Sequence, residues 1–186
     1  MIANPGLQRV ELSLRQRLLL LAGGLLLLAF ADFVVLERIY KPLATARAIP
    51  WSDFELRFDL AGWPVRMLQW HVAFLPLGLG MFALVGVAAR DLRLALAGCV
   101  LFATGWEDLV YYAIQATSPP AELPWLDPNP CIAWTSWVLP GEHVTAPGLC
   151  LAALAGGIAT AWILRGRGGT HAPPCTDAEK ILPDRR

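Results

Sequence analysis

The chain has 186 residues, and its 15 Lys and Arg balance its 15 Asp and Glu, so the formal net charge is zero. Charged residues make up 16% of the chain, against about 25% in ordinary soluble domains, while 56% are hydrophobic and the mean hydropathy is +0.49. This composition excludes a disordered chain and a basic nucleic-acid-binding protein. With only 4 Cys, the chain is not a disulfide-rich miniprotein either. The apolar residues are concentrated in long runs, which predicts an all-α integral membrane protein embedded in the lipid bilayer.

Four runs have the length of a transmembrane helix. They cover 17–40, 64–89, 94–115 and 142–164, and we predict that they form a four-helix bundle in a single domain over residues 1–165. A helix needs roughly 20 residues to cross a hydrocarbon core about 30 Å thick. The uncharged stretches before Asp32 and Glu107 reach only roughly 21 and 20 Å. The first and third runs therefore cross only if Asp32, Glu107 and Asp108 lie inside the membrane.

Basic residues indicate the orientation of the bundle. The side of the two termini carries Arg9, Arg15, Arg17, Arg90, Arg93, Arg165, Arg167, Lys180, Arg185 and Arg186. By the positive-inside rule we predict that both termini are cytoplasmic, in a bacterial cytoplasmic (inner) membrane, with 166–186 as a flexible tail. The sequence at 44–46 has the small residues of a signal-peptide cleavage site. The apolar region before it is longer than a signal peptide requires, so a retained first helix is the preferred interpretation.

Two long loops face the outer side in this topology. In 41–63, Ser52 and Glu55 have capping-box spacing, and Trp51, Phe54 and Phe58 fall on roughly one face, which predicts a short interfacial helix. Pro64 then suits the first turn of the second span. Loop 116–141 contains six Pro and three Trp, which is typical of an ordered lid or of an aromatic belt without a lid function.

Small residues recur every four positions on the fourth span. They are Gly148, Ala152, Gly156 and Thr160. This spacing favours the close approach of another helix, either within the chain or from another membrane subunit.

Ionisable groups from all four runs are predicted in the outer half of the bundle. Asp32, His71 and Glu107 lie about 12, 10 and 13 Å below the outer helix ends at helical rise. Glu142 and His143 open the fourth span at the outer boundary. If the third span is one straight helix, an arc of about 100° contains Thr104, Glu107, Asp108, Tyr111 and Gln115.

Several of these residues also have purely structural interpretations. Glu37 has the i,i+4 spacing for an ion pair with Lys41, and Glu142 would be favoured by the helix dipole. His71 resembles a hydrogen-bonded core histidine, and Tyr111 could be a packing aromatic. The three intramembrane acids are harder to explain, because no Lys or Arg lies in the spans at their depth. They need protons, a water-filled cavity or a metal ion.

The leading hypothesis is an outward-facing pocket that binds a divalent transition metal such as Zn or Fe and acts on a lipid-phase or quinone-like substrate. The predicted metal ligands are His71, Glu107, His143 and Glu142. Asp108 or Asp32 would serve as general base and Tyr111 as proton donor. Three alternatives stay open: a non-catalytic subunit of a larger membrane complex that docks through the Gly148, Ala152 and Gly156 face, a haem protein with His71 and His143 as axial ligands, and proton-coupled transport.

Overall fold

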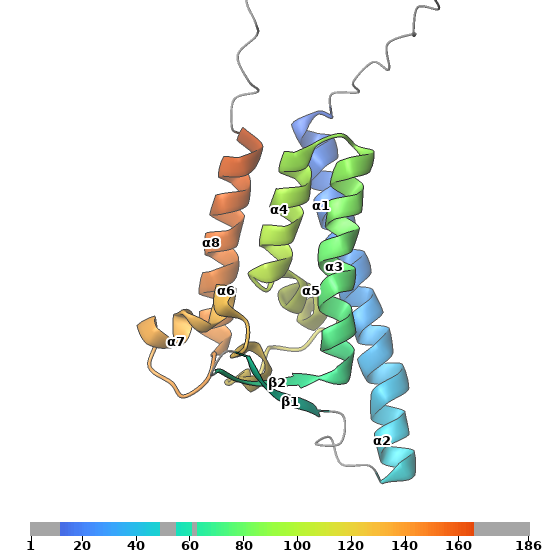
Figure 1. Ribbon diagram of the computed structural model, residues 1–186, viewed down its shortest axis with the longest axis vertical. Helices are drawn as coiled ribbons and strands as arrows, with labels where there is room; N and C mark the ends of the chain where they lie inside the picture. The colour runs from blue at the N-terminus through green and yellow to red at the C-terminus, as the bar shows by residue number, and fades with distance from the viewer. Residues whose placement is uncertain (1–11, 49–54, 61–62, 166–186) are drawn as a thin grey trace, which may run out of the picture.

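The computed structural model describes residues 12–48, 55–60 and 63–165, which are mostly helical (Figure 1). Its long elements are α1 (Leu14–Phe33), α3 (Gln69–Ala88), α4 (Leu92–Ala103), α5 (Trp106–Ile114) and α8 (Ala146–Arg165). Three helices are long and apolar enough to cross a membrane, and a fourth crossing results if the bent pair α4 and α5 counts as one span. The predicted cytoplasmic tail lies outside the described residues.

The first helix is longer than the predicted 17–40. Ser13 caps it, because its side chain accepts a hydrogen bond from the backbone N–H of Gln16 while the Gln16 side chain accepts from the backbone N–H of Ser13. Helical structure then continues through a π-helical segment, η1 (Val34–Tyr40), into α2 (Lys41–Arg47). The whole helix covers 34 residues, more than a membrane crossing requires.

The outer loop after this helix forms a hairpin, so the prediction of an interfacial helix there is wrong for the described residues. β1 (Glu55–Leu60) pairs antiparallel with β2 (Trp63–Leu68) in a two-stranded sheet. The sequence ELRFDL alternates polar and apolar residues, and this period of two favours a strand over a helix. Both strands are edge strands, where a proline such as Pro64 is tolerated. The second long helix therefore begins at Gln69, five residues later than predicted.

A sharp bend divides the third predicted span. The axes of α4 and α5 differ by 64°, so 94–115 is not the single straight helix that the sequence predicted. Thr104 leaves the helical conformation, with φ −95° and ψ 13°, and Gly105 follows with φ +81°. Only glycine adopts that left-handed conformation readily. Thr104 therefore caps α4 and does not share a helical face with the acids of α5.

Hydrogen bonds satisfy the backbone carbonyls that the bend releases from α4. The Thr104 hydroxyl donates to the Val100 carbonyl at 2.8 Å and to the Leu101 carbonyl at 3.3 Å. The Gly105 N–H donates to the Phe102 carbonyl at 3.2 Å. The Ala103 carbonyl accepts a 2.9 Å bond from the side-chain amide of Asn129 in the following loop. Because unsatisfied carbonyls are costly in an apolar interior, these bonds make the bend a stable feature.

The small residues of α8 pack inside the chain. A Cβ added at Gly156 would lie 1.9 Å from the Thr104 hydroxyl, so α8 approaches the bend as closely as a glycine permits. A Cβ at Gly148 would meet Thr135 at 2.7 Å, and the buried Thr160 hydroxyl donates to the Ala97 carbonyl. The predicted subunit-docking face is thus occupied by α4 and the outer loop of the same chain.

The outer loop 116–141 is compact. It contains a 3₁₀ turn, η3 (Pro124–Leu126), and two short helices, α6 (Pro130–Ala133) and α7 (Thr135–Val138). Its apolar side chains form a second core against α8, made of Leu123, Leu126, Ile132, Val144, Leu149 and Ala152. The loop is therefore packed onto the helices and does not hang free.

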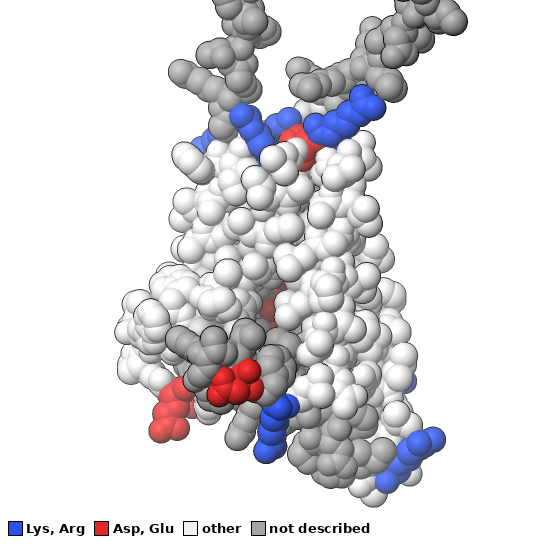
Figure 2. Space-filling view, viewed as in Figure 1, with Lys and Arg blue, Asp and Glu red and all other residues white. Residues whose placement is uncertain are grey.

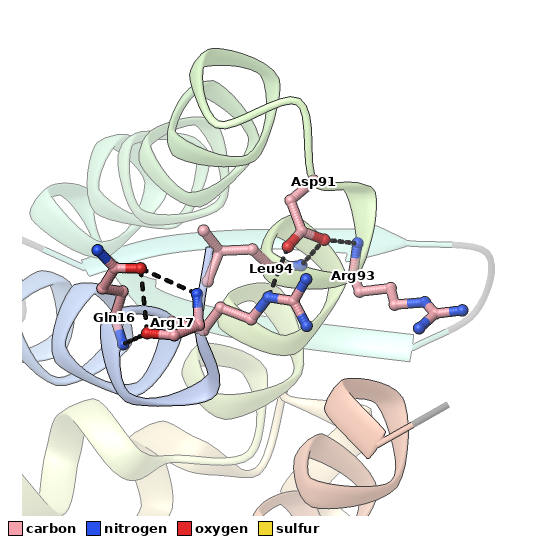
Figure 3. Close-up of polar contacts among 6 residues, drawn as sticks. Gln16, Arg17, Asp91, Arg93 and Leu94 are labelled. Carbon is pink, nitrogen blue, oxygen red and sulfur yellow. Dashed lines mark hydrogen bonds and ion pairs between the residues drawn. The ribbon is translucent and has the colours of Figure 1, made fainter. Parts of the chain in front are cut away.

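Charges are separated along the long axis of the molecule. Lys and Arg side chains gather at the end where α1 starts and α8 ends, an apolar band follows, and further charges lie at the opposite end (Figure 2). We call the end where α1 starts and α8 ends the basic end. There, Asp91 caps α4 by accepting hydrogen bonds from the backbone N–H groups of Arg93 and Leu94 (Figure 3). Arg17 pairs with the same carboxylate at 2.8 Å and so ties α1 to α4.

We predict that Gly105→Ala destabilises the protein by at least about 2 kcal/mol. An alanine in the left-handed conformation costs roughly 1–2 kcal/mol, and overpacking typically adds 1–3 kcal/mol. The new Cβ would lie 2.3 Å from Leu149 Cδ1. Thermal unfolding in a nonionic detergent measures the change.

Gly80→Ala is the matched control, because a Cβ at this position of α3 meets nothing within 4 Å. This variant should be as stable as the wild type or more stable, since alanine is the better helix former. Equal losses at Gly80 and Gly105 would contradict the structural role of the bend.

Candidate functional site

Three carboxyl groups from α1 and α5 form the acidic cluster: Asp32, Glu107 and Asp108. Asp32 is 6% exposed and Glu107 5%, and Asp108 is half-buried. The three groups are close enough to interact electrostatically with one another. The acids that the sequence required inside the membrane are therefore brought together by the fold.

The bend at Gly105 positions two of these acids. Glu107 and Asp108 occupy the first turn of α5, where the free N–H groups and the helix dipole favour negative charge. The Trp106 indole donates a 2.7 Å bond to the Ala153 carbonyl and fastens this turn to α8. The rest of α5 packs on α1, which brings the turn towards Asp32.

Asp32 is held by an indole. The Trp70 Nε1–H donates to Asp32 Oδ1 at 2.6 Å, joining the start of α3 to α1. The Trp70 ring in turn lies 5.3 Å from that of Phe74, measured between centroids. Residue Asp32 thus has a neutral donor where a buried carboxylate would ordinarily have a basic partner.

Glu107 is the exceptional member of the cluster. Its Oε1 atom is fully buried and has no hydrogen-bond partner among the described residues. In the part of the chain that the structure describes, the ion pairs Arg17–Asp91, Lys41–Glu37 and His143–Asp127 all lie outside the acidic cluster. A buried carboxylate oxygen left unsatisfied in this way is rare in folded proteins and indicates a group that binds something.

A second polar group extends from the cluster along the same side of α5. Glu37 accepts hydrogen bonds from the Tyr111 hydroxyl at 3.1 Å and from the Gln115 amide at 3.3 Å. It also pairs with Lys41, which confirms the predicted i,i+4 ion pair. Glu37 lies in the π-helical segment η1, whose i→i+5 hydrogen bonds change the facing of the residues after Asp32. Tyr111 consequently lies between the two acidic groups and interacts electrostatically with both Glu37 and Asp32.

Acidic atoms are visible below the apolar surface. Figure 2 shows red atoms recessed between white side chains at the level of α5, where α4 has ended and α5 has turned away. Some acidic atoms are thus visible from outside between the side chains of an otherwise apolar band.

The other predicted metal ligands are not gathered around this cluster. Among residues 12–48, 55–60 and 63–165 no group of three or more His, Cys, Asp or Glu side chains is arranged to hold a metal ion. His71 is half-buried in the first turn of α3, and Glu142 is exposed. Glu142 and His143 also precede α8, which begins at Ala146, so the prediction that they open the fourth helix is wrong.

His143 serves the loop instead. Its Nδ1 atom lies 2.7 Å from Asp127 Oδ2, and Asp127 Oδ1 accepts a 2.8 Å bond from the backbone N–H of Val144. Asp127 thus ties the loop 116–141 to the segment that leads into α8.

Sequence reasoning missed Trp70, Asp127 and Asn129. Asp127 and Asn129 stand in the segment DPNP, where an Asx residue before a proline is a turn signal that could have identified them as loop anchors. Trp70 has no such signal, because its partner lies 38 residues away in the sequence.

Comparisons with protein-family models, with curated proteins and with solved structures found no match. The protein is mostly helical, with helices long and apolar enough to cross a membrane, and among the described residues its acidic cluster contains a buried carboxylate oxygen without a hydrogen-bond partner.

We predict that the contact between Asp127 in the loop 116–141 and His143 before α8 weakens as the pH rises. The hydrogen bond to Asp127 raises the pKa of His143 above its ordinary value of 6.5, and the charges of Asp127, Glu122 and Glu142 add to this. The added stability is fully present below about pH 6.5 and is lost as the pH rises through the raised value. Both side chains are more than a third exposed, so the effect is local and small.

Hydrogen exchange of the amides in 123–145, corrected for intrinsic rates, should reveal more frequent opening at pH 8 than at pH 6. In Asp127→Asn this difference should disappear, whereas it should largely persist in Glu142→Gln. The same pH dependence in Asp127→Asn would show that another group controls the loop.

Proposed function

We propose that this chain is a four-span membrane protein whose outer half contains a proton-holding, cation-binding site, namely the acidic cluster. Three helices qualify as spans, and α4 with α5 supplies the fourth. The concentration of Arg at the basic end supports a cytoplasmic position for both termini, as the positive-inside rule requires. α4 begins at this end and rises about 18 Å over 12 residues, so α5 starts beyond the middle of a core about 30 Å thick.

The single observation that carries the proposal is the unpartnered carboxylate oxygen of Glu107. Three ionised carboxylates cannot share an apolar interior without compensation, because desolvation and mutual repulsion both oppose their charge. Water in a cavity can solvate such groups, but only protons or a bound cation compensate their charge. A site that can hold either will exchange one for the other.

The cytoplasmic half favours a site that communicates with the outer side alone. Between the basic end and the cluster, the described helices are packed through an apolar core. This core contains Leu21, Leu25, Leu28, Phe82, Leu94, Ala97, Leu101 and Leu164. Proton-coupled transport needs polar steps through this region, and the core offers none among its members. Binding, or acid–base chemistry on a bound molecule, fits the packing better.

The metal hypothesis has less support than proton exchange. Transition metals need ligands that converge to about 2.0–2.3 Å, and the described residues contain no preformed set. General-base catalysis by Asp108 or Asp32, with Tyr111 as proton donor, would use the same cluster and stays a prediction. A haem held by His71 and His143 has no supporting contact, since His143 is engaged by Asp127.

Infrared spectroscopy of the protein in lipid nanodiscs tests the proposal. At pH 7, with metal ions and amines removed, the wild type should show the carbonyl stretch of protonated, buried carboxyl groups. Glu107→Gln should lose part of this band, because it removes one of the groups that share the protons. Glu142→Gln replaces an exposed acid and should leave the band unchanged. A wild-type spectrum without any protonated carboxyl band would contradict the proposal.

A further inference from the structure

Aromatic side chains of the described residues lie beside the acidic cluster. The Trp70 indole is bonded to Asp32, and the Tyr111 ring lies 6.4 Å from Phe33 and 5.5 Å from Tyr112, measured between centroids. Tyr112 interacts electrostatically with both Asp32 and Asp108. Phe33, Trp70, Tyr111 and Tyr112 are defined here as the aromatic wall of the site. Carboxylates combined with aromatic faces are complementary to an organic cation, which the rings attract through their quadrupoles.

The lack of a preformed metal-ligand group among the described residues favours an organic cation over a metal ion. A metal ion requires its ligands to converge on one point, and no such group exists among the described side chains. An ammonium group has N–H donors that point in different directions, and it donates to carboxylate oxygens at about 2.7–2.9 Å. It can therefore bond to carboxylates that do not converge on one point. The free Oε1 of Glu107 provides an acceptor for one of these donors.

The surface around the cluster determines what else the ligand must carry. The surface around the recessed acidic atoms is apolar (Figure 2). It belongs to the band of the molecule in which large side chains such as Leu84, Leu154 and Ile158 are 60–70% exposed. A molecule that reaches the cluster through this band needs an apolar body, because a polar body would lose its contact with water when it enters the lipid.

We propose that the acidic cluster binds the protonated amine of a lipophilic molecule that enters from the outer half of the membrane. This inference rests on the proposed function and names the class of cation. The ammonium ion binds to the protonated cluster, one carboxyl O–H bond breaks, and its proton leaves to the outer solution. No bond forms between ligand and protein, and total charge is conserved.

Proton release on binding provides the test. Dodecylamine is added to the full-length protein in nanodiscs of zwitterionic lipid at pH 7, and a pH-sensitive dye in dilute buffer reports released protons. Empty nanodiscs supply the baseline. The wild type should release about one proton per chain at saturation. Dodecanol, which has the same chain length and no charge, should release none.

Glu107→Gln should raise the half-saturating concentration of dodecylamine at least about tenfold, since a hydrogen bond to a charged group is worth about 1.5–3 kcal/mol. Glu142→Gln is the matched control and should behave as the wild type. If Glu107→Gln does not fold, Asp32→Asn replaces it, with the same expected loss.

Two results would overturn the inference. In the first, the infrared band of protonated carboxyl groups is present, but dodecylamine releases no proton above the baseline. The proposed function would then survive, and the assignment of the ligand as an amine would be wrong. In the second, Zn²⁺ or Na⁺ releases protons and dodecylamine does not, which would return the site to a metal cation. Absence of the infrared band itself would instead contradict the proposed function.

Discussion

The left-handed turn at Gly105 is the constraint on which the rest of the structure depends. It ends α4 after 12 residues and redirects α5 by 64°, which places two carboxyl groups in the first turn of a helix inside the bundle. The turn persists because Thr104 and Asn129 satisfy the released carbonyls and because Gly156 lets α8 approach Thr104. Asn129 belongs to the loop 116–141, so its bond to the Ala103 carbonyl also holds this loop against the bend. One backbone conformation thus connects the helix packing, the outer loop and the acidic cluster.

The presence of long apolar helices could be predicted from the sequence, because it follows from the rise per residue and from the concentration of apolar side chains, whereas the exact ends of the helices could not. Asp32, Glu107 and Asp108 were singled out because the first and third runs are too short without them, and the fold brings these three groups together; their depth in a membrane stays a prediction. The pairing of Glu37 with Lys41 was predictable as well, because it depends only on a local spacing.

The remaining features depend on contacts between distant segments. The bend was missed because an isolated glycine in an apolar run is compatible with a straight helix, and only its packing against Leu149 and Ile132 distinguishes the two. The hairpin was missed because the capping-box spacing of Ser52 and Glu55 outweighed the two-residue alternation that follows. The predicted role of His143 failed because its partner, Asp127, lies in a proline-rich loop whose path the sequence does not determine.

Glu107 is buried, and its Oε1 has no hydrogen-bond partner among the described residues, so a stability measurement on Glu107→Gln tests most directly whether this carboxyl group lacks a compensating charge. Thermal unfolding at neutral pH should find this variant as stable as the wild type or more stable, because it removes an uncompensated carboxyl group and preserves its shape. Glu37→Gln, which weakens an acceptor shared by Lys41, Tyr111 and Gln115, should be less stable than the wild type. A loss of about 3–5 kcal/mol in Glu107→Gln, as when a buried ion pair is broken, would contradict the account.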